Sequence, residues 1–159
     1  MLTWMRTIVR HSVDGMAQKD LDCLFDANAN TIGSLLLHLA ATEKYYQLNT
    51  LEARAWDSWP DSVKQKWDVP MGLGDVARKT IKGSNLQYCL NTLNETREHS
   101  PAEFRKRDDA WLTAVDQKWP WGPTNNYCKW FHVCEHESNH NGQIKFLAMR
   151  LPGAQPSKE

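Results

Sequence analysis

The chain has 159 residues, a length that a single domain accounts for and that can bury roughly two thirds of its unfolded surface without disulfides. Its 19 Lys and Arg residues balance its 19 Asp and Glu residues, so no net charge draws it to nucleic acid or to an anionic membrane. No apolar run can span a bilayer, and four cysteines without Cys-x-x-Cys spacing or an export signal indicate reduced thiols in a cytoplasmic protein.

The first half of the chain shows the period of amphipathic helices, with apolar residues recurring every three to four positions. One such stretch covers residues 2–16. A longer helix follows the polar entry at 27–30 and covers 32–56, where the pattern fades. Prolines and glycines at 60–74 predict an irregular connection with a short helical piece around 61–66.

The third long helix is expected to open near Ser84 and to stop before Ser100. Ser100 has Glu103 three residues later and Pro101 directly after it. This is the pattern of a capping box with proline at the first helical position, which predicts a new, short helix at this point.

A loop rich in tryptophan and proline at 119–123 precedes the last long helix, which we expect over about 125–150. No alternating pattern of a strand competes with these helices. The sequence therefore predicts an all-α four-helix bundle over residues 1–153 with long crossover connections. A polar tail that we expect to be disordered follows at 154–159.

Three of the six histidines, His132, His136 and His140, follow one another at steps of four in the last predicted helix. Such residues form one stripe on a helix. Val133 falls on the same side and Asn141 on the opposite one, so the imidazoles should face the core. Burying several ring nitrogens is costly unless they are bound. A divalent metal satisfies them, because two histidines four residues apart on one helix are a recurring pair of ligands.

His38, the only histidine in the second predicted helix, lies beside its apolar stripe. Two helices that each offer an inward histidine can converge on one metal. His132 and His140, about 12 Å apart along the helix axis, cannot both reach it. Spacing alone leaves open whether His136 pairs with His132 or with His140. The remaining histidine could orient a ligand, carry protons or bond to a carboxylate such as Glu43.

Other side chains are candidates for supporting roles. Gln143 lies one turn beyond His140 and could orient a ligand or substrate, or simply pack in the bundle. Glu43 and Glu137 could act as acid–base groups, although an orienting or surface role is favoured for both, and His132 could carry protons. The charged run at 97–109 alternates in sign, which is typical of an exposed face.

The segment NTIGSLLLHLAATE, residues 30–43, and the segment WFHVCEHESNHNGQI, residues 130–144, resemble the DinB/YfiT-like superfamily of damage-inducible four-helix-bundle proteins. The stretch RKRDDAWL, residues 105–112, is similar to one in an uncharacterised subfamily, and the likeness covers nearly the whole chain. The resemblance implies a divalent metal, often nickel or zinc, bound by His38, His136 and His140. Asn141 stands where the superfamily commonly has arginine.

Superfamily members of known activity are metal-dependent thiol transferases, and the resemblance implies a substrate that is a small molecule, with a low-molecular-weight thiol. Three neutral imidazoles leave the charge of a divalent metal uncompensated, so it can activate water or hold a thiolate. Such ligands suit zinc, nickel, iron or cobalt. We therefore expect a thiol S-transferase, with a metal-dependent hydrolase or a non-catalytic metal- or ligand-binding protein as alternatives. Related bundles often form homodimers.

Overall fold

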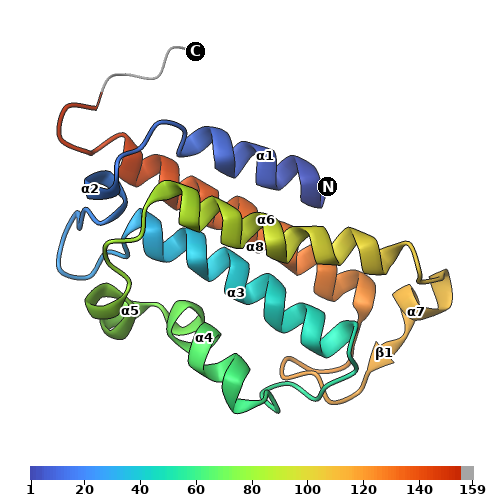
Figure 1. The fold of residues 1–159 in the computed structure, drawn as a ribbon. Coiled ribbons are helices and arrows are strands. Elements are labelled where there is room, and N and C mark those ends of the chain that lie inside the picture. The colour runs from blue at the N-terminus through green and yellow to red at the C-terminus, as the bar shows by residue number, and fades with distance from the viewer. Residues whose placement is uncertain (155–159) are drawn as a thin grey trace.

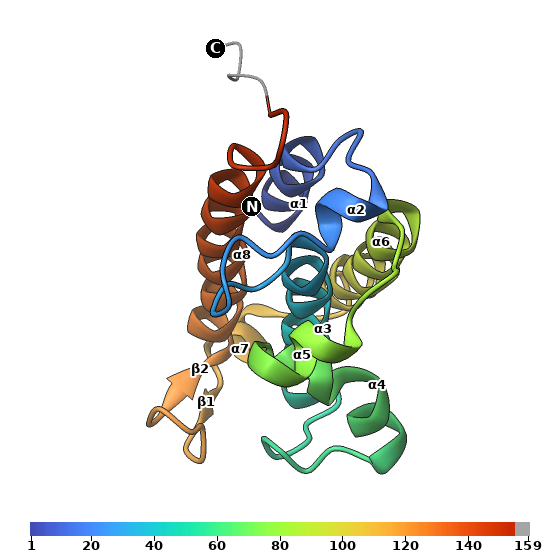
Figure 2. The same ribbon diagram turned by 90° about the vertical axis from the view of Figure 1, so that its left-hand side faces the viewer.

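The computed structural model of the chain describes residues 1–154, and most of the predicted polar tail lies outside them. Four long helices run side by side along the molecule (Figures 1 and 2). They confirm the prediction of an all-α helix bundle, whereas the domain boundary at residue 153 stays a prediction. Their bounds are Leu2–Ser12 for α1, Ile32–Thr50 for α3, Leu86–Phe104 for α6 and Asn126–Ala148 for α8.

Short elements fill the crossovers between the long helices. α4 and α5 follow α3 and lie along one side of it (Figures 1 and 2). A two-residue antiparallel pair, β1 and β2, precedes α8, although the sequence predicted no strand. The bounds are Gln18–Leu21 for α2, Asp61–Gly72 for α4, Gly74–Thr80 for α5, Asp109–Thr113 for α7, Val115–Asp116 for β1 and Thr124–Asn125 for β2.

Three predicted helix ends are wrong. α1 ends at Ser12 rather than at residue 16, because the chain turns at Gly15, whose φ of 71° is left-handed. α3 stops at Thr50, six residues before the predicted end. The connection after it is more helical than predicted, since α4 continues through Pro70.

The predicted break before Ser100 is also wrong, because α6 runs through it to Phe104. The Ser100 hydroxyl caps no helix. It donates to Glu43 Oε1 at 2.7 Å and accepts from Gln47 Nε2 at 2.9 Å, both on α3. Pro101 removes one helical hydrogen bond in the last turn, where α6 is about to end. Tertiary partners therefore override a valid local signal.

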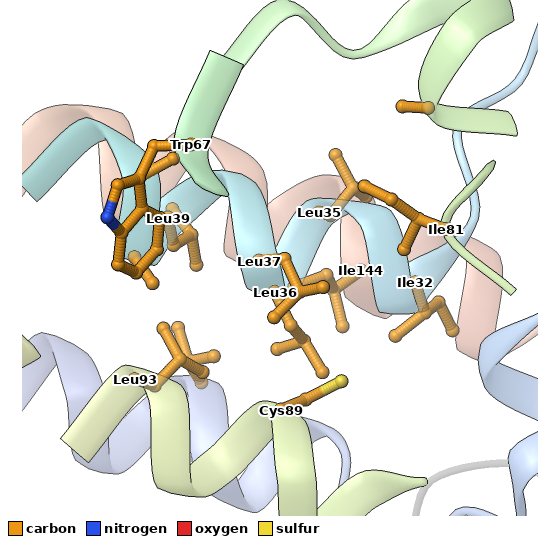
Figure 3. Close-up of a cluster of buried hydrophobic side chains, with 14 of the residues drawn as sticks. Ile32, Leu35, Leu36, Leu37, Leu39, Trp67, Ile81, Cys89, Leu93 and Ile144 are labelled. Carbon is orange, nitrogen blue, oxygen red and sulfur yellow. The ribbon is translucent and has the colours of Figure 1, made fainter. Parts of the chain in front are cut away.

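α3 is the central helix of the fold, and among its 19 residues only Lys44 is not buried. Its N-terminus is capped by Thr31, whose hydroxyl accepts from Ser34 N at 3.1 Å. Its apolar side chains, among them Leu36 and Leu39, pack against apolar side chains from α4, α6 and α8 (Figure 3). These include Trp67, Leu93 and Ile144. Every polar side chain on α3 except that of Lys44 is therefore inside the protein and needs a partner there.

Each long helix contributes one charged side chain to a buried ion network, which consists of Arg6, Glu43, Arg97 and Glu137. Every Arg–Glu pair is in contact, at distances between 2.5 and 3.0 Å. Further guanidinium hydrogens reach main-chain carbonyls. The run at 97–109 was predicted to be exposed, which is wrong for Arg97, since that residue is 7% exposed.

No helix within residues 1–154 has the length and apolar character needed to cross a membrane.

Candidate metal centre

The structure brings together His38 from α3 with His136 and His140 from α8. The Nε2 atom of His136 lies 3.1 Å from that of His38 and 3.2 Å from that of His140. One nitrogen from each ring belongs to a group whose atoms all lie within 4.8 Å of one another. We call these three residues the histidine triad. It is the set that the family resemblance implied, and its role as a set of metal ligands stays a prediction.

The His38 ring is held from behind by the main chain of α4. His38 Nδ1 lies 3.0 Å from the carbonyl oxygen of Pro70. A carbonyl only accepts, so Nδ1 carries the hydrogen and Nε2 presents its lone pair to the other rings. The Pro70 carbonyl is free for this bond because the last four carbonyls of a helix have no partner within it.

His140 is held in the same way by a neighbouring side chain. Its Nδ1 lies 3.1 Å from Gln143 Oε1, which accepts the Nδ1 hydrogen and leaves the Nε2 lone pair facing His136. Two lone pairs therefore point at His136 Nε2, and a neutral imidazole has only one hydrogen to offer them. His136 Nδ1 is buried and has no partner among residues 1–154. A metal ion held by the three residues would accept all three lone pairs, so the donor set fits a metal ion.

The environment keeps the triad uncharged. Burial, together with the smaller effect of neighbouring His140, lowers the pKa of His38 to about 4. Burial, followed by the neighbouring histidines, lowers the pKa of His136 to about 3. Burial also lowers the pKa of His140, against the opposing effect of Gln143. Because a histidine ligates as the neutral imidazole, the triad is ready to bind a metal at neutral pH.

The triad lies at the edge of the packed face of α8, with His136 and His140 partly exposed. Asn141 was predicted to lie opposite the core, which is wrong, because it is 5% exposed. Glu137 and Ile144, also buried, show that the packed face is centred beside the histidine stripe. The rings are consequently accessible from one side. Within residues 1–154, no further His, Cys, Asp or Glu joins the group.

A pocket of about 540 Å³ lies beside the triad, between α8 and the loop that leads into α3. Gln143, which contacts His140, is part of its wall. Amide side chains dominate its polar lining, with an apolar side from α3 and α8. The lining includes Asn28, Asn30, Leu35, Asn139, Gly142, Gln143, Phe146 and Leu147. Its volume is in the range of small-molecule sites.

The acid–base candidates are placed differently. Both carboxylate oxygens of Glu43 are taken up in the buried ion network. Burial would raise the pKa of Glu43, but Arg97 and Arg6 outweigh it and hold the pKa low. The suggestion that Glu43 could bond to the third histidine of α8 is wrong. His132 Nδ1 instead lies 2.7 Å from the hydroxyl of Tyr46.

Tyr46 is the site residue that the sequence reasoning missed. It lies eight residues after His38 on α3, and His132 lies eight residues before His140 on α8. Since the triad shows that these helix faces meet, the matching spacing in opposite directions could have paired the two residues. Aromatic rings cluster on this side of the site. They belong to Tyr46, Trp56, Trp119, Trp121 and Trp130.

The family model of mycothiol-S-transferase matches residues 1–151, almost the entire described chain. Among curated proteins no significant match was found. The matching family is part of the DinB/YfiT-like superfamily, which confirms the resemblance seen in the two histidine segments. The chain belongs to the mycothiol-S-transferase family.

Proposed function

We propose that the protein binds one divalent cation through His38, His136 and His140 and transfers a low-molecular-weight thiol of the mycothiol type to an electrophilic small molecule. The observation that carries this proposal is the convergence of three Nε2 atoms from two helices beside an open pocket. Catalytic sites of this kind use three protein ligands and keep a position for substrate, whereas structural sites are closed by a fourth.

A divalent cation at this position would supply the positive charge that keeps a bound thiol in its nucleophilic, deprotonated form. The chain's own contribution is to keep three imidazoles neutral and oriented. Burial supplies the neutrality, and the Pro70 carbonyl and Gln143 supply the orientation. The ligands are uncharged, so the protein leaves the full charge of the cation available to the thiol.

We place the body of the thiol in the amide-lined pocket beside the triad. Asn139 and Gln143 lie on α8 within the turn that carries His140. Amide groups both donate and accept hydrogen bonds, which suits the uncharged polar groups of a small thiol. Zinc and nickel are our first choices for the cation, and iron or cobalt also suits three imidazoles. The homodimer and the cytoplasmic location remain predictions.

Elemental analysis and a conjugation assay test this function together. Protein without a polyhistidine tag should contain about one divalent metal per chain, and it should conjugate mycothiol to monobromobimane. Removal of metal by a chelator should abolish turnover, and the same metal should restore it. Hydrolysis without conjugation would favour the hydrolase, and metal with neither reaction would favour a non-catalytic binding protein.

His140→Ala and His99→Ala make a matched pair for the assay, because His99 is an exposed histidine far along the chain from the triad. We expect His140→Ala to lose metal and turnover and His99→Ala to keep both. His132→Ala should retain the metal. Metal uptake that survives His140→Ala but not His132→Ala would overturn the ligand set.

A further inference from the structure

The fourth histidine of the site, His132, is held in the opposite tautomer from His38 and His140. The Tyr46 side chain is buried, and burial raises its pKa above the ordinary value, so its hydroxyl keeps its hydrogen. Among residues 1–154, His132 Nδ1 is the only hydrogen-bond partner of that hydroxyl, at 2.7 Å. The phenol therefore donates to Nδ1. The remaining ring hydrogen of His132 must then lie on Nε2.

The Nε2–H group of His132 is accessible to solvent. It has no hydrogen-bond partner among residues 1–154, and it is not among the buried unpartnered atoms, so it reaches solvent. The His132 ring centroid lies 5.6 Å from that of His136. A molecule reacting at the triad thus meets lone-pair nitrogens from His38, His136 and His140 and a single N–H donor from His132.

The surroundings of His132 differ from those of the amide-lined pocket. The Trp121 ring lies 4.8 Å from that of His132, centroid to centroid, yet Trp121 is 68% exposed. An exposed indole beside a reactive site offers a flat apolar wall to a ligand. Gln143 and its amide neighbours lie at the other end of the histidine stripe, beside His140. The site therefore has a polar amide end and an aromatic end with one fixed donor.

We propose that His132 is a catalytic residue for the electrophile, whose oxygen accepts a hydrogen bond from Nε2–H while its apolar part lies against Trp121. Tyr46 is the positioning residue that fixes the tautomer. The substrate class is an electrophile on which charge develops at oxygen, such as an epoxide or a conjugated carbonyl. The thiol enters from the amide end.

The reaction balances without another reagent. The thiol gives its proton to solvent, and its sulfur forms a bond to a carbon of the epoxide as the carbon–oxygen bond breaks. The electron pair of that bond goes to the oxygen, where the His132 N–H stabilises the charge as it develops. The oxygen then takes a proton from solvent, so the net reaction adds the thiol across the ring.

The tautomer can be measured on the metal-free protein without any assay of activity. Long-range ¹H–¹⁵N spectra of the histidine side chains should show His132 with its hydrogen on Nε2 and His38 with its hydrogen on Nδ1. Tyr46→Phe should remove the Nδ1 hydrogen bond of His132 and leave the His38 pattern unchanged. A His132 hydrogen on Nδ1 in the unmodified protein would overturn the proposal.

Two electrophiles separate a direct role of His132 from a structural one. In the conjugation of mycothiol to styrene oxide, charge develops on oxygen. With monobromobimane it leaves on bromide, and no donor is needed at the oxygen position. We expect His132→Phe to slow the epoxide reaction roughly 100-fold and Tyr46→Phe up to about tenfold. The bromide reaction should change by less than about threefold, within the range of ordinary packing effects.

Tyr45→Phe is the matched control, because Tyr45 is also a buried tyrosine of α3 but donates to Asp68 rather than to a site histidine. It should leave both reactions unchanged. The proposal would be overturned if His132→Phe and Tyr46→Phe slowed the reactions with styrene oxide and with monobromobimane by the same factor. The role of His132 rests on the proposed thiol transfer. If these variants keep their metal content and the reaction with monobromobimane, the thiol transfer itself is intact. A failure of the epoxide prediction then concerns His132 alone.

Discussion

The buried ion network and the histidine triad both use residues of α3 and α8, but their polar groups are partnered in different ways. Glu43 follows His38 by five residues on α3, and Glu137 is next to His136 on α8. Each carboxylate of the network meets two guanidinium groups. The histidine lone pairs face one another, with one face of the site accessible.

This difference shows how polar groups inside one bundle divide into structural and functional sets. A buried charge that is fully paired holds the helices in a single arrangement, because each removed partner leaves another charge uncompensated. A group of hydrogen-bond acceptors that lack a donor can instead bind a ligand from outside the chain, because their lone pairs are not satisfied within it. Burial alone does not distinguish the two sets, whereas the count of donors and acceptors does.

The largest effect should follow from breaking the network. Arg97→Met removes the guanidinium that contacts both Glu43 and Glu137 and leaves Arg6 as the single positive charge in contact with the two carboxylates. Loss of one partner from a buried ion pair typically costs about 3–5 kcal/mol. We expect Tm to fall by about 10 °C or more in calorimetry of the metal-free protein.

Lys106→Met is the control for this loss, because Lys106 pairs with Glu103 on the surface. Exposed pairs contribute little, so its Tm should stay nearly unchanged. A stable Arg97→Met protein would mean that the network contributes no more than such a surface pair.

Removing a histidine of the triad should change the stability of the fold less than breaking the network, and in the opposite direction. His136→Ala removes the nitrogen that lies between the other two, so metal affinity should fall by more than the roughly 10–100-fold that follows loss of an orienting residue. The metal-free protein should keep its Tm or gain, because an unsatisfied buried group is removed. Titration with zinc and calorimetry measure both. A large loss of Tm would assign the triad to the structural set.

Gln143→Ala tests the orienting contact at the edge of the triad. It removes the acceptor for His140 Nδ1 but none of the three Nε2 atoms. We expect zinc affinity to fall about tenfold, with little change in Tm. Lys145→Ala, two residues further and exposed, should bind zinc as the unmodified protein does. Equal affinities for the two variants would remove Gln143 from the site.

The smallest effect is the pH dependence of the metal-free protein. The native pKa values of His38 and His136, about 4 and about 3, lie below the ordinary value of 6.5. Between pH 6.5 and 4 the unfolded chain therefore binds more protons, and stability falls as the pH falls. From pH 7 to pH 6 these two residues together should cost about 1 kcal/mol, a loss of a few degrees in Tm.

His136→Ala should show a shallower fall in Tm over the same interval, because it has one of these groups fewer. A Tm that rises from pH 7 to pH 6 would contradict neutral, buried imidazoles. The ion network should not contribute, since the arginines hold the pKa of Glu43 below its usual range.

Much of the bundle and the triad could be predicted because periodic patterns report on them directly. Four amphipathic stretches gave the four long helices, and the steps of four on α8 placed its histidines on one stripe. The family resemblance, rather than spacing, selected His136 and His140 as the pair that meets His38. Spacing within one helix carries no information about the height at which a second helix meets it.

Other features depend on contacts between distant segments, and local patterns misreported them. The capping box at Ser100 is a sound local signal, but its hydroxyl serves Glu43 on another helix. Arg97 reads as part of an exposed charged run, yet its partners come from α3 and α8. The histidine stripe predicts Asn141 opposite the core, whereas the packed face of α8 is centred on Glu137 and Ile144 beside that stripe. Each error comes from a pairing that a single helix does not encode.

The bond from His38 to α4 has a consequence for how this site tolerates change. The acceptor belongs to the main chain of Pro70, so substituting the side chain at position 70 leaves the oxygen in place. A change in the length of the segment between α3 and α4 would instead move that oxygen along the axis of α3. The site should consequently accept many point substitutions in this crossover and few insertions or deletions, so indels rather than substitutions would mark the limits of its sequence variation.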